Sequence, residues 1–266
     1  MARRRPRGPT RAELTRCLAE VLGTDRLGLL LAHERTLEPA ERGAFRGMCE
    51  RLLEGEPLAY VLGHQEFRGR RFAVDPAVLI PRPETEELVE HAIAMLPESA
   101  RVFEPCTGSG CISVSLALER PDLWILASDI SGEALEVARK NAKALAPDAK
   151  LEIAEGDYWA AAGGRVFDAL VANPPYVDPS KPELLDQLVE RYEPAVALFD
   201  PEARSHVELL RGGVDGLESG ALVLLECGAD TAGLVLAKVE KSASYVDGEL
   251  IEDLQGIKRI LRCRRR

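Results

Sequence analysis

The sequence predicts an α/β fold in which a small N-terminal helical bundle and a linking β-hairpin precede a parallel β-sheet. From residue 100 onward, short apolar segments alternate with amphipathic helical segments, which is typical of strand–helix–strand units in a parallel sheet. Before residue 64, apolar residues recur at helical spacing instead. Five strands are predicted, at residues 101–105, 124–128, 150–154, 167–172 and 221–227. The last third alternates less regularly, so the sequence defines its elements less sharply.

The helical bundle begins at a recognisable start signal. Thr10 is followed three residues later by Glu13, a capping-box pattern, and apolar residues then follow at helical spacing from Leu14 to Leu22. Further short helices, separated by Gly and Pro, continue to Gly63. We therefore assign residues 1–66 to an N-terminal helical domain and expect residues 1–9 to be disordered.

A hairpin and a helix are predicted to link this bundle to the sheet. Phe67, Phe72 and Val74 flank Gly69 in a pattern typical of two short strands joined by a turn. After Pro83 a helix is predicted that Pro97 ends, with acidic residues in its first turn that suit the helix dipole. Residues 67–96 are thus assigned to the linker, and residues 97–266 to a catalytic domain.

The composition of the 266 residues indicates a globular protein with a full core. Hydrophobic residues make up 46% and charged residues 29% of the chain, and no apolar stretch approaches the roughly 20 residues of a membrane span. The basic start lacks the apolar run of a secretory signal, so we expect a cytoplasmic protein. The six cysteines form no Cys-x-x-Cys pair and the four histidines are scattered. We therefore expect reduced thiols and no bound metal.

The charge is distributed unevenly. Residues 1–11 hold five Arg and residues 258–266 hold six Lys or Arg, so the rest of the chain carries 23 basic against 44 acidic residues. Such an acidic body repels a phosphate backbone, which argues against long DNA and against a stable nucleic-acid partner. The basic ends are more typical of solvated, disordered tails than of contacts with ribosomal RNA.

A glycine-containing loop follows the first predicted strand of the sheet. In the segment Cys106-Thr107-Gly108-Ser109-Gly110, glycine permits close approach of a ligand to the backbone, and the next helix offers free N–H groups. Asp129 ends the following strand, where doubly wound folds place an acid that binds ribose hydroxyls; capping of the next helix is the alternative role. Because Ser113 replaces the third glycine of a dinucleotide fingerprint, the pattern favours S-adenosylmethionine over a dinucleotide.

A second candidate for the cofactor site is the segment Gly156-Asp157-Tyr158-Trp159 after the third strand. An acid and two aromatic rings suit adenine, whose amino group requires an acceptor and whose ring stacks on an aromatic face. Packing of Trp159 in the core is an equally reasonable interpretation.

The most specific motif is Asn173-Pro174-Pro175-Tyr176, which directly follows a buried strand. The prolines fix the backbone and remove N–H donors, so the loop can present an array of acceptors. If the side-chain oxygen of Asn173 and the carbonyl of Pro174 accept both N–H bonds of a planar nitrogen, its π face is turned toward a sulfonium methyl group. Tyr176 would cover the planar group. The alternative is an ordinary strand-ending turn with an aromatic plug.

With these motifs, the chain resembles the release-factor glutamine methyltransferase family, the HemK-like proteins, over nearly its whole length. The resemblance rests on an interdomain signature that methyltransferases in general do not share. Motifs similar to the family's fifth-strand end and closing motif add to it. The segments are Gly55-Glu56-Pro57-Leu58-Ala59-Tyr60, Val74-Asp75-Pro76, Ile80-Pro81-Arg82-Pro83-Glu84-Thr85-Glu86, Glu226-Cys227-Gly228 and Asp253-Leu254-Gln255-Gly256-Ile257.

This resemblance implies a class I methyltransferase, with a Rossmann-like seven-stranded sheet, that uses S-adenosylmethionine. It implies N5-methylation of the glutamine in the Gly-Gly-Gln loop of class I peptide release factors, with the helical domain docking the release factor. It further implies Asn173, Pro174, Pro175 and Tyr176 as contacts of the substrate amide, with Asn173, Pro174 and Tyr176 catalytic. The implied cofactor residues are Glu104, Cys106, Thr107, Gly108, Ser109, Gly110, Asp129, Asp157, Tyr158 and Asn173.

Two departures from the family pattern keep other functions open. Cys106 replaces the first glycine of the loop, where its side chain would crowd the methionine end of the cofactor. After Phe199, Asp200-Pro201-Glu202 replaces a Gly-Gly-x-Asp-Gly-Leu segment, while Asp215-Gly216-Leu217 follows later. One alternative is an amino-methyltransferase that acts on a nucleic-acid base, because a similar loop receives flipped bases in such enzymes. A second is methylation of another protein glutamine. A third is a degenerate member that binds a partner without cofactor.

Overall fold

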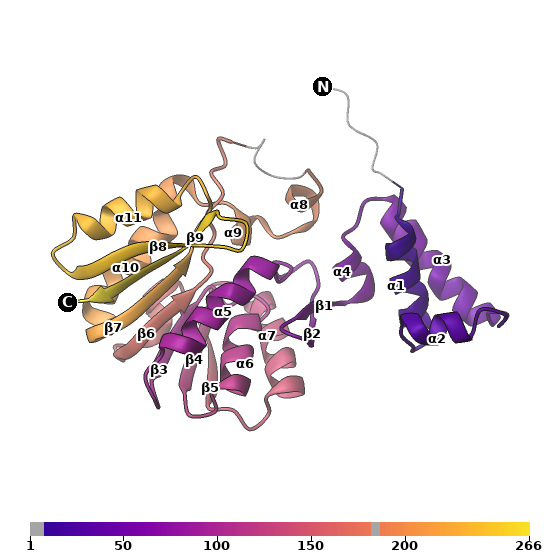
Figure 1. The fold of residues 1–266 in the computed structure, drawn as a ribbon, viewed down its shortest axis with the longest axis horizontal. Helices are drawn as coiled ribbons and strands as arrows, with labels where there is room; N and C mark the ends of the chain where they lie inside the picture. The colour runs from indigo at the N-terminus through magenta and orange to yellow at the C-terminus, as the bar shows by residue number, and fades with distance from the viewer. Residues whose placement is uncertain (1–7, 182–186) are drawn as a thin grey trace.

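The computed structural model describes residues 8–181 and 187–266, and it has the predicted α/β architecture (Figure 1). The expected disorder of residues 1–9 lies largely outside the described residues, which begin at Gly8. None of the described helices is long and apolar enough to cross a membrane.

Four helices form the N-terminal bundle, which Figure 1 shows set apart from the sheet. In α1, Thr10 and Glu13 make the predicted capping box. Cys17, Leu52 and Val61 form a small buried core together with partly buried neighbours such as Phe45. The helices are α1 (Arg11–Val21), α2 (Arg26–Leu31), α3 (Pro39–Leu53) and α4 (Leu58–Leu62).

The predicted hairpin is present as strands β1 (His64–Phe67) and β2 (Arg70–Ala73), joined at Arg68 and Gly69. Both turn residues have positive φ, 48° and 70°, as a two-residue type I′ turn requires. Phe67 and Phe72 are buried in the same core as the helices that cover one face of the sheet. The hairpin therefore anchors the bundle to the sheet through shared apolar packing.

The central sheet has seven strands in the order β5-β4-β3-β6-β7-β9-β8. Strands β3 to β7 run parallel, whereas β9 is antiparallel to both β7 and β8. The strands are β3 (Arg101–Pro105), β4 (Trp124–Asp129), β5 (Leu151–Glu155), β6 (Phe167–Ala172), β7 (Leu217–Glu226), β8 (Tyr245–Glu252) and β9 (Lys258–Arg265). The five predicted strands are thus confirmed to within a few residues.

The expectation of a solvated basic tail at residues 258–266 is wrong. These residues form β9, which lies between β7 and β8 (Figure 1). Ile260, Leu261 and Cys263 are buried, while the arginines at its edges bond locally: Arg259 to Asp253, for example. The many basic residues of β9 made it look like a tail in the sequence. In the structure their charged ends reach carboxylates and carbonyls beside the sheet.

Helices cover both faces of the sheet, since successive strand residues point to opposite sides. Leu222 and Leu224 of β7 join one core with α5, α6 and α7, while Val223 and Leu225 join the other with α10 and α11. The helices are α5 (Pro83–Met95), α6 (Cys111–Glu119), α7 (Gly132–Leu145), α8 (Gln187–Tyr192), α9 (Ala195–Leu198), α10 (Arg204–Gly216) and α11 (Ala232–Glu240), with short 3₁₀ turns η1 (Tyr158–Ala162) and η3 (Pro201–Ala203).

Candidate functional site

The candidate site lies where the strand order reverses. β3 and β6 are neighbours, but the chain leaves β3 toward β4 on one side and β6 toward β7 on the other. The loops beyond their carboxyl ends therefore diverge and leave a crevice, the usual ligand position in open α/β sheets. A cavity of about 970 Å³, its open mouth included, lies there.

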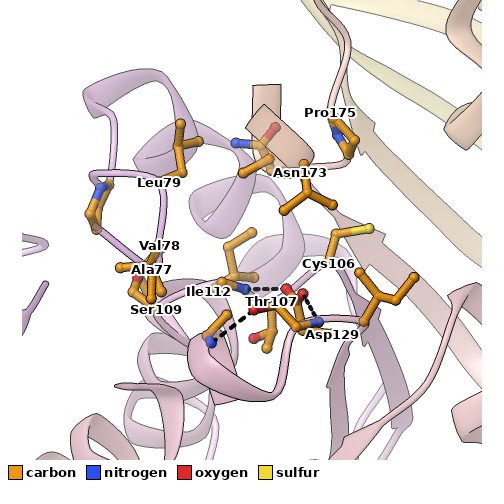
Figure 2. Close-up of a pocket in the computed structure, with 18 of the residues that line it drawn as sticks. Ala77, Val78, Leu79, Cys106, Thr107, Ser109, Ile112, Asp129, Asn173 and Pro175 are labelled. Atoms are coloured by element: carbon orange, nitrogen blue, oxygen red, sulfur yellow. Dashed lines mark hydrogen bonds between the residues drawn. The ribbon is translucent and has the colours of Figure 1, made fainter. Parts of the chain in front are cut away.

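Residues from six separate segments line this cavity, and Figure 2 shows most of them. Figure 2 shows Asn173 and Pro175 on one side, Thr107 and Asp129 on the other, and the segment of Ala77, Val78 and Leu79 forming a further wall. Of the predicted cofactor residues, the lining includes Cys106, Thr107, Gly108, Ser109, Asp129, Asp157, Tyr158 and Asn173. Four predicted residues lie outside the lining, each within two positions of a lining residue in the sequence: Glu104, Gly110, Pro174 and Tyr176.

The loop after β3 is held by Asp129 at the end of β4. The N–H of Gly108 donates to Oδ2 of Asp129 (2.9 Å), and the N–H of Ser131 donates to Oδ1 (3.0 Å). Burial raises the pKa of Asp129, although these backbone bonds lower it. The alternative capping role does not hold, because Ser131 caps α7 through its own bond to Ala134. Asp129 therefore faces the cavity with oxygens that can accept further hydrogen bonds.

Glycine is required at position 110. Its φ is +77°, and an added Cβ would lie 3.3 Å from the Cβ of Ala138 on α7. The close approach lets α6 begin directly at the cavity floor, with Cys111 as its first residue. The sequence predicts free N–H groups at the start of this helix. Such groups can bind an anion or the negative end of a dipole.

Cys106 adopts a backbone conformation that usually belongs to glycine. Its φ is +59°, and its side chain lines the cavity. Burial, together with the carboxylates of Asp129 and Glu104, raises the pKa of the thiol, so it stays protonated at neutral pH. The residue is therefore a neutral, strained wall element, and the cavity persists around it.

Glu104 lies beneath this loop, fully buried in β3. Neither carboxylate oxygen has a hydrogen-bond partner within the described chain. Burial raises the pKa of Glu104 to about 8. An unpartnered buried carboxylate behind the lining of a cavity is a group that a cationic ligand would satisfy if it came within reach.

The two aromatic residues after β5, Tyr158 and Trp159, lie in different surroundings. Trp159 packs in the core against Phe103 and Phe167, and its indole N–H donates to the carbonyl of Leu209 (2.9 Å). Tyr158 lines the cavity, and its hydroxyl lies 2.8 Å from that of Ser205. The core interpretation of Trp159 is therefore confirmed, and Tyr158 is the ring next to the cavity.

The loop after β6 combines one polar group with rigid apolar neighbours. The side-chain nitrogen of Asn173 donates to the hydroxyl of Thr85 on α5 (3.2 Å). Pro175 lines the cavity, whereas the ring of Tyr176 packs against Gly228, where an added Cβ would lie 2.9 Å from the ring. Burial raises the pKa of Tyr176, so its hydroxyl stays neutral.

Sequence reasoning missed one wall of the site. Ala77, Val78, Leu79, Arg82 and Thr85 line the cavity, although no site role was predicted for them. Ile130 also lines it and is 53% exposed, which places an apolar face beside Asp129. The only signal for this wall was the interdomain signature at residues 74–86. Among the described residues, no group of three or more His, Cys, Asp or Glu is arranged to hold a metal ion.

The seven-stranded sheet and the cavity at its switch point define an S-adenosylmethionine-dependent methyltransferase of class I architecture. A methyltransferase from Pyrococcus furiosus has this fold, with a TM-score of 0.52 at 17% identity over 81% of this chain and 96% of that one.

The chain belongs to the release factor glutamine methyltransferase family. Residues 7–63 match the PrmC N-terminal domain and residues 85–195 match the methyltransferase small domain. The release factor glutamine methyltransferase of Neisseria gonorrhoeae is 44% identical over 217 residues, covering 80% of this chain and 78% of the relative. That of Escherichia coli is 36% identical over 245 residues, covering 88% of each chain.

Proposed function

We propose that this enzyme methylates N5 of the glutamine in the Gly-Gly-Gln loop of class I peptide release factors. The observation that carries the proposal is the position of Asn173. It lines the same cavity as the Asp129 loop, and its amide nitrogen is already bonded to Thr85. Its side-chain oxygen is therefore available to accept an N–H bond from a substrate amide.

The residues of the cavity fit S-adenosylmethionine. Asp129 offers oxygens for ribose hydroxyls, and Ile130 and Tyr158 offer apolar and aromatic faces for adenine. Glu104, behind the lining, has an unpartnered carboxylate that suits an ammonium group. The bound cofactor supplies an electrophilic methyl group. We assign the cofactor site to Glu104, Cys106–Gly110, Asp129, Asp157, Tyr158 and Asn173.

The remaining chemistry is positioning by the loop at residues 173–176. An amide nitrogen is a poor nucleophile because its lone pair is delocalised, so orientation contributes much of the catalysis. Asn173 and the carbonyl of Pro174 accept the two N–H bonds, and Tyr176 limits the space around the planar group. The alkylated nitrogen is acidic and loses its proton to solvent, so no dedicated general base is needed.

The N-terminal domain is proposed to dock the release factor. Leu27, Leu30 and Leu31 on α2 are 63%, 65% and 79% exposed, which is unusual for three leucines on one six-residue helix. A protein partner is the simplest way to cover such a patch. The division at residue 66 follows from this assignment, with residues 67–96 as the link.

Transfer of a labelled methyl group tests the proposal. The enzyme is incubated with labelled cofactor and either a class I release factor, the same factor with its Gly-Gly-Gln glutamine replaced by alanine, or a single-stranded oligonucleotide. We expect label only in the unaltered factor, and peptide mapping should place it on that glutamine. Label that enters only the oligonucleotide, or equally the alanine variant, would contradict the proposal.

The variant Asn173→Ala tests the role of Asn173 in the site. Loss of one preorganised acceptor typically lowers turnover by about 100- to 1,000-fold. We expect that loss with cofactor binding, followed by calorimetry, largely retained. Unchanged turnover would refute the role of Asn173.

A further inference from the structure

One wall of the cavity, which we call the wall segment, is residues 77–82 between β2 and α5. This segment belongs to no helix or strand. It therefore has no ladder of backbone hydrogen bonds to hold it, and its buried polar groups require partners from other elements. The residues of the wall segment that line the cavity are Ala77, Val78, Leu79, Pro81 and Arg82.

The chain just before the wall segment is fixed to the glycine-containing loop by Asn141 of α7. The side-chain oxygen of Asn141 accepts from the N–H of Ala73 (2.7 Å), and its nitrogen donates to the carbonyls of Ala73 (3.0 Å) and Ser109 (2.8 Å). Asn141 is 2% exposed, and Ser109 lines the cavity. The start of the wall segment is therefore held independently of the residues that follow it.

The other end of the wall segment is bonded to a buried carboxylate, Glu193, which follows α8. Oε2 of Glu193 accepts from the N–H of Ile80 (3.1 Å), and Oε1 accepts from the guanidinium of Arg82 (2.5 Å). The side chain of Glu193 is 1% exposed, whereas that of Arg82 is 32% exposed and lines the cavity. One carboxylate from a distant part of the chain thus holds two residues of this wall.

The chain that follows Glu193 forms another side of the cavity. Residues 196–197 line it. The N–H of Val177 donates to the carbonyl of Leu198 (2.9 Å), and Val177 directly follows the loop at residues 173–176. Glu193 therefore joins the wall segment to a stretch of chain that is itself bonded beside the loop at residues 173–176.

We propose that Glu193 is a positioning residue that holds the wall segment against the cavity and so sets the affinity for S-adenosylmethionine. This role rests on the cofactor site proposed above. Glu193 does not line the cavity, so it acts only through Ile80 and Arg82. When a site is formed in only a fraction of the molecules, the apparent Kd of its ligand rises as that fraction falls. Loss of Glu193 therefore weakens binding without removing a contact to the cofactor.

A hydroxyl of the N-terminal domain holds the middle of the wall segment. The hydroxyl of Tyr60 on α4 donates to the carbonyl of Val78 (2.6 Å), and Tyr60 is 3% exposed. Tyr60, Val78 and Ile80 also belong to one small apolar core. Tyr60 thus supports the same wall from a second direction, which provides an independent variant for the test.

The variant Glu193→Gln tests the inference directly. Glutamine keeps the shape but has one acceptor oxygen, so its NH₂ group faces one of the two donors. We expect calorimetry to show a Kd for S-adenosylmethionine about 10-fold higher, the factor that one lost charge-assisted hydrogen bond corresponds to. The KM for the cofactor should rise with it, whereas kcat at saturating cofactor should stay close to that of the wild type.

Glu119→Gln is the matched control. Glu119 accepts from Arg68 and Arg70, but it is the last residue of α6, whose first residue lines the cavity. Both variants should lower the melting temperature, and only Glu193→Gln should raise the Kd. Hydrogen exchange of the Ile80 N–H should also become faster only in Glu193→Gln.

Tyr60→Phe covers the case in which Glu193→Gln does not fold. It removes one neutral hydrogen bond from the wall segment, so we expect the Kd to rise about 5-fold. An unchanged Kd in the folded variant would overturn the inference. So would an equal rise in Glu119→Gln, or a fall in kcat at an unchanged KM.

Two results separate this inference from the proposals on which it rests. If Asp129→Ala binds the cofactor as tightly as the wild type, the proposed cofactor site fails, and the role of Glu193 fails with it. Calorimetry and hydrogen exchange need no release factor. Absence of methyl transfer to that substrate would therefore contradict the proposed function, while the binding measurements would still decide the role of Glu193.

Discussion

The buried carboxylate of Glu104 predicts an unusual dependence of stability on pH. An unfolded glutamate titrates near its ordinary value of 4.5, whereas burial raises the pKa of Glu104 to about 8 in the folded chain. Between these values the folded state binds the proton more tightly than the unfolded state. The free energy of unfolding therefore falls as pH rises from about 4.5 to about 8 and becomes level above that.

The size of the effect follows from the same two values. An interval from 4.5 to about 8, at about 1.4 kcal/mol per pH unit, corresponds to about 5 kcal/mol. This is comparable to the whole stability of many domains, which is about 5–15 kcal/mol. Glu104→Gln keeps the shape of the side chain and removes the titration, so the variant should escape this loss.

Urea unfolding of both proteins at pH 5 and pH 9, without cofactor, measures the effect. From pH 5 to pH 9 the difference in unfolding free energy should move in favour of Glu104→Gln by about 4 kcal/mol, because part of the titration of the unfolded carboxyl lies below pH 5. Glu34→Gln, at a side chain that is 90% exposed, serves as the control and should leave the pH profile unchanged. Parallel stability curves for the wild type and Glu104→Gln would refute the assignment of a protonated buried carboxyl.

Two further substitutions test the walls of the site. Cys106→Gly removes the strain of a non-glycine residue at a φ of +59°, but glycine also gains freedom in the unfolded chain. We therefore expect the free energy of unfolding to change by less than about 1 kcal/mol. Because the variant also removes the thiol from the cavity, we expect calorimetry to show a higher cofactor affinity. Weaker binding would contradict this. Gly216→Ala would place a Cβ 2.2 Å from Trp159, so thermal denaturation should show a loss of about 1–3 kcal/mol, whereas Gly43→Ala on α3, with open space around it, should be stabilising. Equal melting temperatures would exclude a tight slot for Trp159.

The central parallel strands β3, β4 and β6 were predictable because each is buried on both faces. Residues 101–105 and 167–172 are apolar runs between turn signals, and such runs need no knowledge of their neighbours. β9 was not predictable in this way. Its arginines suggest a tail until β7 and β8 are in place to pair its backbone and accept its side chains.

The candidate site likewise contains residues that local sequence signals predict and residues that they do not. The loops at residues 106–110 and 173–176 carry local signals, because glycine and proline restrict the backbone wherever they stand. The wall at residues 77–85 carries none, since its residues are ordinary apolar ones brought in by the path of the hairpin. Trp159 remained ambiguous because its slot is made by Gly212 and Gly216, more than 50 residues away.

The irregular C-terminal third packs against the loop at residues 173–176. Glu226 ends β7 beside Asn173, and Gly228 leaves the space that the ring of Tyr176 occupies. β9 pairs with β7 up to Glu226, so the strand that ends just before Gly228 is held on its outer side by the segment whose charge suggested a tail. Thr85 completes the arrangement from 88 residues before Asn173. The surroundings of Asn173 and Tyr176 are therefore built from α5, β6, β7 and β9 together, so a four-residue motif alone does not define the substrate.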